Sequence, residues 1–178
     1  TWPSEIAKWE HTKNIRASVV MGAVKERSAA LLKPAEVYVI NRENVKWLLE
    51  ESNMPMDFDM IVIDEISSFK SYQAKRFRAL MKLRPSVKCI VGLTGTPSAN
   101  GLMDLWAEFR LLNMGKRRGR FISSYRDAYF LPDKRNQQMV FSYKPCEGAE
   151  DAIYRRIGDI TISMRAREYL KMPNLVSP

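Results

Sequence analysis

The sequence predicts an α/β fold in which a parallel sheet is flanked by helices and followed by a mainly helical C-terminal appendage. Four short apolar runs rich in β-branched residues are typical of buried parallel strands. They occupy residues 17–21, 37–40, 60–63 and 89–93, and segments long enough for helices separate them. Strands that alternate with helices in this way indicate a parallel sheet covered by the helices.

Two of the helix-length segments, residues 71–83 and 101–113, each carry one apolar face, as expected of helices that cover a sheet. In the first segment the opposite face is basic. The apolar residues are Ala74, Phe77, Leu80 and Met81 in the first segment, and Leu102, Leu105, Trp106, Phe109 and Leu112 in the second.

The alternation of strands and helices ends at about Asn113, and the chain that follows is basic and aromatic. Within it, helices are expected over residues 148–157 and 163–170. We therefore expect an α/β domain over residues 1–113 and an appendage over residues 114–178. The aromatic residues of the appendage interleave with arginine and lysine, which indicates either a small helical core with a charged exterior or a surface that contacts DNA.

Charge and cysteine content limit the functional classes. The 178-residue chain has a formal charge of +9, and residues 113–178 hold 13 basic but only 7 acidic groups. The densest basic cluster, residues 116–120, fits either a phosphate-backbone contact or a solvated loop. Two cysteines and one histidine are too few for a disulfide framework or a four-ligand zinc site, so a reduced, cytosolic setting is expected. No apolar run reaches the ~18–20 residues of a membrane span, so no membrane partner is expected.

Lone aromatic and sulfur-containing residues are expected to be structural. The four tryptophans fall on predicted helices among apolar neighbours, which favours packing over base stacking. Cys89 opens a predicted buried strand and is expected to be a small core residue. His11 is expected at the surface.

Two adjacent carboxylates, Asp64 and Glu65, directly follow the apolar run of residues 60–63. A buried strand of this kind places both acids at the carboxyl edge of the sheet, where ligands of open α/β folds bind. In nucleoside triphosphatases such a pair serves magnesium and the attacking water. The same pattern also arises by chance at strand ends, so the pair alone leaves both interpretations open.

A polar turn with the sequence Thr-Gly-Thr-Pro follows the apolar run of residues 89–93 and occupies residues 94–97. It predicts a strand-to-helix connection in which Gly95 takes an unusual backbone angle, Pro97 fixes φ and Asn100 caps the next helix. It also fits a sensor loop whose hydroxyls lie beside a γ-phosphate. The two motifs lie about 30 residues apart with one helix between them, and this pairing favours the functional interpretation.

The two motifs together resemble motifs II and III of superfamily 2 helicases, in particular the Swi/Snf-like double-stranded DNA translocases. Motif II is matched by Asp64, Glu65, Ile66, Ser67 and Lys70, and motif III by Leu93, Thr94, Gly95, Thr96, Pro97 and Asn100. The similarity extends to nearly the whole chain. Trp2, Glu5 and Trp9 resemble the helix after motif Ia, and residues 37–45 resemble the motif Ib region, with Asn41 and Arg42 where a Thr-Tyr pair is common.

The resemblance implies a RecA-like P-loop NTPase lobe that carries motifs Ia to III and belongs to an ATP-dependent helicase or translocase. By that resemblance Asp64 positions Mg²⁺ through a water and Glu65 activates the attacking water. The residues expected to contact ATP and Mg²⁺ are Asp64, Glu65, Thr94, Gly95 and Thr96. The residues expected to couple the site to nucleic acid or to contact it are Ser67, Lys70, Pro97, Asn100, Asn41 and Arg42.

The implied partners are DNA, double-stranded and bound without sequence preference, and a second RecA-like lobe in the same polypeptide. Sequence-independent contact suits a translocase because a motor must step across any sequence. The implied compartment is the cytoplasm of a bacterial cell, with a bacterial or phage gene, or the nucleus of a eukaryote.

The chain departs from the family in two places. It contains no Gly-x-x-x-x-Gly-Lys-Ser/Thr loop, so we expect that loop upstream of Thr1 and the second lobe beyond Pro178. Ser67 stands where many relatives have His, so the link to motif III is expected to run through a hydroxyl. Without the phosphate-loop strand, the edge of residues 89–93 is left unpaired, and we expect self-association through it, or marginal folding, together with poor ATP binding and no activity in the isolated chain.

Two alternatives remain. The first is a non-catalytic module that binds nucleic acid or protein on a RecA-like scaffold. The second is a small-molecule phosphotransferase, which is weaker because the Thr-Gly-Thr-Pro turn has no natural role there and a charge of +9 is unusual for that class.

Overall fold

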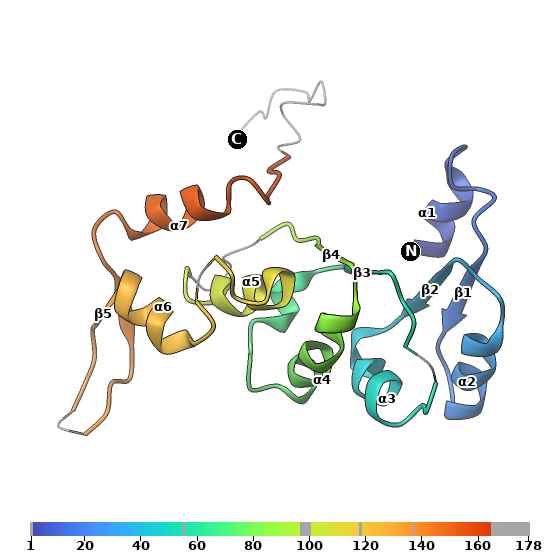
Figure 1. The fold of residues 1–178 in the computed structure, drawn as a ribbon, viewed down its shortest axis with the longest axis horizontal. Coiled ribbons are helices and arrows are strands. Elements are labelled where there is room, and N and C mark those ends of the chain that lie inside the picture. The colour runs from blue at the N-terminus through green and yellow to red at the C-terminus, as the bar shows by residue number, and fades with distance from the viewer. Residues whose placement is uncertain (1, 55, 97–100, 118, 137, 165–178) are drawn as a thin grey trace, which may run out of the picture. The chain divides into compact units, whose positions relative to one another are not determined.

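The computed structural model describes residues 2–54, 56–96, 101–117, 119–136 and 138–164 (Figure 1). The chain divides into two compact units, Thr1–Met114 and Gly115–Pro178, which are called unit 1 and unit 2 below. Pro97, Asn100 and most of the helix predicted over residues 163–170 lie outside the described residues.

Unit 1 is built on two pairs of parallel strands. Strand β1 (Ala17–Val20) pairs with β2 (Val37–Ile40), and β3 (Met60–Ile63) pairs with β4 (Cys89–Gly92). All four predicted strands are therefore present and parallel, which confirms the predicted α/β class. The sequence predicted one sheet here, whereas the described residues of unit 1 form two, because no described strand supplies ladder hydrogen bonds between β2 and β3.

Helices and short 3₁₀ turns connect and cover these strands. The described helices and turns of unit 1 are α1 (Trp2–Lys8), α2 (Val24–Leu32), η1 (Arg42–Asn44), α3 (Val45–Glu50), η2 (Ile66–Phe69), α4 (Lys75–Leu83), η3 (Arg84–Ser86) and α5 (Leu105–Asn113). Helix α2 packs on β1, α3 packs against α4, and α5 packs against both β4 and η2 (Figure 1).

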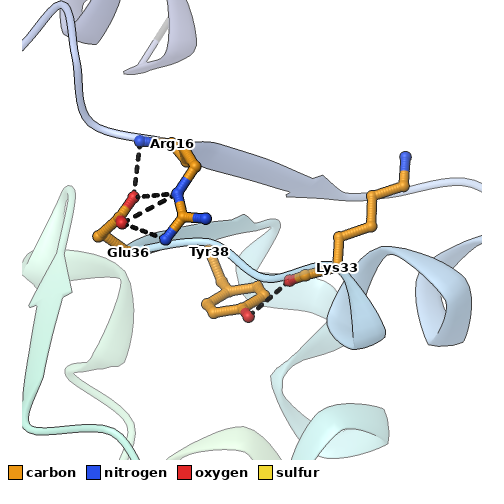
Figure 2. Close-up of polar contacts among 4 residues, drawn as sticks. All are labelled: Arg16, Lys33, Glu36 and Tyr38. Carbon is orange, nitrogen blue, oxygen red and sulfur yellow. Dashed lines mark hydrogen bonds and ion pairs between the residues drawn. The ribbon is translucent and has the colours of Figure 1, made fainter.

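The first pair of strands is held at its amino end by a charged contact (Figure 2). The Arg16 guanidinium donates to both carboxylate oxygens of Glu36, and the Arg16 backbone N–H donates to Glu36 Oε2 at 2.8 Å. These hydrogen bonds lower the pKa of Glu36 to about 2. Tyr38 donates its hydroxyl to the Lys33 carbonyl at 2.8 Å, which ties β2 to the end of α2. The contacts fix the register in which Ala17 pairs with Val37.

Strands β1 and β3 each expose one face within the described chain. In β1, Ser18 and Val20 are buried, whereas Val19 is exposed. The outward side chains of β3 are 55% exposed at Met60 and 48% at Val62. The sequence predicted buried strands, and the difference arises because no described element covers this apolar face.

The tryptophans divide into two classes. Trp47 and Trp106 are buried, and the Arg27 guanidinium carbon lies 4.0 Å from the Trp47 ring centroid. Trp2 in α1 and Trp9, which directly follows α1, are 40% and 51% exposed, so the prediction that they pack among apolar neighbours is wrong. Cys89 is also exposed, because it sits on the outward face at the start of β4.

The described part of unit 2 contains two helices and a hairpin. Helix α6 (Ile122–Tyr129) leads into β5 (Phe130–Pro132), which pairs antiparallel with β6 (Tyr143–Pro145). Helix α7 (Ala149–Ile157) follows at nearly the residues that the sequence predicted. The hairpin was not predicted, because its strands are short and end in prolines.

The described aromatic residues of unit 2 divide between a buried cluster and the surface. Tyr125 is fully buried, and its ring lies 5.3 Å from that of Tyr129 and 5.4 Å from that of Phe130. Phe121 and Phe141 are exposed. A small core therefore exists, and part of the aromatic set remains at the surface.

A buried arginine closes the end of α5 inside unit 1. Arg84 lies in η3 and is only 8% exposed. Its Nε donates to the Leu111 carbonyl and its Nη2 to the Leu112 carbonyl, both at 2.8 Å, and its Nη1 donates to the Val87 carbonyl at 3.1 Å. The last carbonyls of a helix have no intrahelical partner, and a cation there is favourable. Arg84 therefore satisfies the end of α5 and joins it to the start of β4.

We predict that Arg84→Met destabilises unit 1 by about 2–4 kcal/mol, because it leaves three carbonyls without their charged donor. All four tryptophans lie in unit 1, so urea unfolding followed by tryptophan fluorescence measures the change. Arg78→Met, at an exposed position of α4, is the matched control and should change stability little. A loss of less than about 0.5 kcal/mol for Arg84→Met would contradict the role assigned to this side chain.

Candidate active site

The carboxyl ends of β3 and β4 lie side by side and are joined beyond the strands themselves. The Leu93 N–H donates to the Ile63 carbonyl at 2.9 Å, and the Ile66 N–H donates to the Leu93 carbonyl at 2.9 Å. The chain after each strand is therefore held by the other strand. This brings Asp64 and Glu65 to the same place as Thr94.

Glu65 occupies a constrained position in this turn. Its backbone has φ 54° and ψ 61°, a left-handed conformation that costs a non-glycine residue on the order of 1 kcal/mol. Its Oε1 accepts hydrogen bonds from Ser67 Oγ and from Thr94 Oγ1, each at 2.7 Å. The Ser67 hydroxyl, followed by the Thr94 hydroxyl, lowers the pKa of Glu65 below its ordinary value. Glu65 is therefore an oriented anion at neutral pH.

Asp64 is approached from the first helix of the chain. The indole N–H of Trp2 donates to Asp64 Oδ2 at 2.9 Å, across 62 positions of sequence. Asp64 directly follows β3, and Trp2 begins α1. No local pattern in the sequence indicates this contact, because the helix and the strand meet only in the tertiary fold.

The turn after β4 is compact and open to the outside. The Thr96 N–H donates to Thr94 Oγ1 at 3.2 Å, so Thr94 supports the turn as well as Glu65. The sequence predicted an unusual backbone angle at Gly95, but Gly95 is not among the described glycines with a positive φ. No described atom lies within 4 Å of the place where a Cβ on Gly95 would stand.

Lys70, Arg42 and Asn41, which the sequence also predicted as site residues, differ in their contacts. Lys70 follows η2, and its Nζ lies 3.7 Å from Asp104 Oδ2, just before α5. Arg42 pairs with its neighbour Glu43, and its charge also contributes to the lowered pKa of Glu65. The side chain of Asn41 makes no capping hydrogen bond to η1. Of the predicted site residues, the structure joins Glu65, Ser67 and Thr94 directly, and Asp64 precedes Glu65 in the chain.

A buried acid that sequence reasoning missed lies on α5. Glu108 is 2% exposed, and its Oε1 has no hydrogen-bond partner among the residues that the structure describes. Burial, followed by the charges of Asp104 and Glu65, raises the pKa of Glu108 to about 7, while Lys70 opposes the shift. The available signal was a glutamate between Ala107 and Phe109, within the apolar pattern of the predicted helix.

Comparison with known proteins identifies the family. The model of the SNF2-related domain matches residues 1–142. The chain belongs to the SNF2-related family. It therefore represents the N-terminal lobe of a Swi/Snf-like superfamily 2 helicase, as the motif resemblance predicted.

Relatives and a solved structure agree with this SNF2 assignment. The chain is 35% identical over 175 residues to putative protein p41 of Acyrthosiphon pisum secondary endosymbiont phage 1, covering 95% of this chain and 38% of p41. It is 32% identical over 109 residues to mouse DNA excision repair protein ERCC-6-like 2, covering 59% of this chain and 7% of the mouse protein. The chain therefore spans well under half the length of these relatives.

The fold is similar to that of the Sulfolobus solfataricus SWI2/SNF2 ATPase core solved in complex with dsDNA. The TM-score is 0.65 and the identity is 25%, covering 89% of this chain and 30% of the Sulfolobus chain. The SNF2 lobe described here thus has the RecA-like fold of an ATPase core. Its family comprises ATP-dependent DNA translocases and helicases. None of the described helices has the length and apolar character needed to cross a membrane.

We predict that Glu108 makes unit 1 less stable as pH rises. An acid whose pKa is raised on folding keeps its proton in the folded state after the unfolded state has lost it, so stability falls between about pH 4.5 and pH 7 and stays constant above. Glu108→Gln should therefore match the wild type near pH 4.5 and exceed it by on the order of 2–3 kcal/mol at pH 8. Urea unfolding at the two pH values, followed by tryptophan fluorescence, measures this.

Glu10→Gln is the control for the loss of one carboxylate, since the Glu10 side chain is 87% exposed. It should leave the pH dependence unchanged. If Glu108→Gln lost stability in parallel with the wild type from pH 4.5 to pH 8, the assignment of a raised pKa to Glu108 would be wrong.

Proposed function

We propose that this chain supplies the water-activating and coupling half of the nucleotide site in an ATP-dependent DNA translocase. The observation that carries the proposal is the pair of 2.7 Å hydrogen bonds from Ser67 and Thr94 to one oxygen of Glu65. They connect the acid after β3 directly to the turn after β4. Asp64 would hold Mg²⁺ through a water, Glu65 would orient the attacking water, and Thr94, Gly95 and Thr96 would contact the nucleotide. Pro97 is proposed to take part in coupling the nucleotide state to DNA.

The lowered pKa of Glu65 suits a residue that orients water in the ground state. As an anion it accepts a hydrogen bond from water, but a carboxylate held by two hydroxyls is a weak base. Loss of the Thr94 hydrogen bond would raise its pKa and its basicity. Movement of the 94–97 turn would therefore change the chemistry at Glu65, which is the form of coupling that we propose.

The oxygen ligands after β3 fit magnesium. Mg²⁺ is usually held by one or two carboxylates and completed by water and substrate phosphate oxygens. Among the residues that the structure describes, no group of three or more His, Cys, Asp or Glu could hold a metal. When bound, the ion would neutralise charge on the phosphates. Asp64 and Glu65 would each keep the orientation set by their hydrogen bonds.

We propose that the phosphate-binding loop and the second RecA-like lobe lie in parts of the polypeptide outside these 178 residues. The chain holds no Gly-x-x-x-x-Gly-Lys-Ser/Thr sequence and covers 38% of p41. Backbone amides and a lysine are needed to cradle the phosphates. The isolated chain is therefore proposed to bind ATP poorly and to hydrolyse none.

Double-stranded DNA, bound without sequence preference, is the proposed partner. The net charge of +9 favours a polyanion, and the Sulfolobus relative was solved in complex with dsDNA. Lys70, Arg42, Asn41 and Asn100 are the proposed contact or coupling residues, and the basic chain after Asn113 adds phosphate contacts. A non-catalytic binding module on the same scaffold is the alternative, and ATP hydrolysis separates the two.

We also propose self-association of the isolated chain through β4. Within the described residues β4 pairs only with β3, and Val91 and Leu93 are exposed beside its free edge. An exposed apolar strand edge is a template for pairing with another chain. Sedimentation of a monomer at all concentrations would contradict this.

We predict that Glu65→Gln in the full-length protein lowers DNA-stimulated ATP hydrolysis at least ~100-fold while leaving DNA binding intact, because the amide keeps the shape but loses the charge that orients water. Steady-state ATPase assays with and without duplex DNA measure this, and filter binding measures DNA affinity. Asp57→Asn, at an exposed position, is the control for loss of one negative charge. ATP turnover that is unchanged in Glu65→Gln, or that ignores DNA in the wild type, would contradict the proposed function.

A further inference from the structure

The hydrogen bond between Trp2 and Asp64 stands apart from the contacts that hold Glu65. It joins α1 to the end of β3, two elements separated by most of unit 1, with Trp2 Nε1 lying 2.9 Å from Asp64 Oδ2. The other oxygen of the carboxylate, Oδ1, has no hydrogen bond within the described part of the chain. One oxygen is therefore held and the other is available.

Trp9, the other exposed tryptophan near α1, makes a different contact. Trp9 directly follows Lys8, the last residue of α1, and its Nε1 donates to Glu5 Oε2 at 3.0 Å. This contact joins residues four positions apart on the same segment. The Lys8 ammonium lies 5.2 Å from the Trp9 ring centroid. Trp9 thus forms a local surface cluster, whereas Trp2 reaches a distant acid.

We propose that Trp2 is a positioning residue for Asp64, holding Oδ2 so that Oδ1 faces a divalent cation at the end of β3. The cation is the part of this inference that rests on the proposed function. The hydrogen bond itself does not depend on it.

The chemistry of the indole suits this task. The terminal torsion of an aspartate is broad, so a free carboxylate samples many orientations. A directional N–H donor restricts that torsion. Indole is a donor only and does not ionise, so it cannot compete with the carboxylate as a ligand for the cation. The ring is long and rigid, which lets one side chain reach from α1 to the strand end.

The test uses ¹H–¹⁵N spectra of the 178-residue chain, in which the four indole N–H signals are assigned by single Trp→Phe substitutions. Asp64→Ala should shift the Trp2 indole signal and leave the Trp9 signal in place. Glu5→Ala should do the reverse. If Asp64→Ala left the chemical shift of the Trp2 indole N–H unchanged, the inference would be overturned. This result would not depend on whether the proposed function is correct.

Magnesium alone provides the second measurement, read from the ¹³C signal of the Asp64 carboxyl group. Removing a hydrogen-bond partner of a metal-binding carboxylate typically weakens the metal about 10-fold or more. Trp2→Phe should therefore weaken the Mg²⁺-induced shift of Asp64 about 10-fold in affinity, whereas Trp9→Phe should not change it. Equal affinity in Trp2→Phe and the wild type would overturn the positioning role.

The two failures can be told apart. If Mg²⁺ leaves the Asp64 signal unmoved in the wild type, the proposed function loses its magnesium residue, and the cation part of this inference falls with it. If Mg²⁺ moves the Asp64 signal with no dependence on Trp2, the proposed function stands and the inference is overturned.

Discussion

The pairing of β3 with β4 is the interaction on which the rest of the site depends. Parallel strands end at the same edge of a sheet, so their following residues meet there whatever their separation in sequence. In this chain the ladder continues through Leu93 and Ile66 after the strands have ended. That continuation fixes the turn in which Glu65 takes a left-handed conformation. Without it, the Ser67 and Thr94 hydroxyls would have no common carboxylate to bind.

Each charged group of the site is held by a different element. Asp64 is contacted from α1, Glu65 from the turn after β4, and Lys70 from the residue before α5. A shift of any one of these elements therefore changes one group and leaves the others. A site assembled in this way can report separate events, such as nucleotide binding and nucleic-acid contact, to the same pair of strands.

The four strands and the family could be predicted because each depends on local sequence: apolar runs, a carboxylate pair, and a Thr-Gly-Thr-Pro turn. The contact of Trp2 with Asp64, the contacts of Arg84 with Leu111 and Leu112, and the burial of Glu108 could not, because each depends on tertiary packing. Periodicity places a tryptophan on a helix but does not say which side of the domain the helix meets. The strand faces were misjudged for the same reason, since burial depends on what covers them.

The pKa values of Glu65 and Glu108 are shifted in opposite directions by their surroundings. Hydroxyl donors lower the pKa of Glu65, whereas burial without a partner raises that of Glu108. The two acids also interact, because the charge of Glu65 contributes to the raised pKa of Glu108. Helix α5 packs on η2, which follows Glu65 directly. An ionised Glu108 would therefore repel Glu65 from inside the domain, so keeping Glu108 neutral favours the anion that faces the solvent.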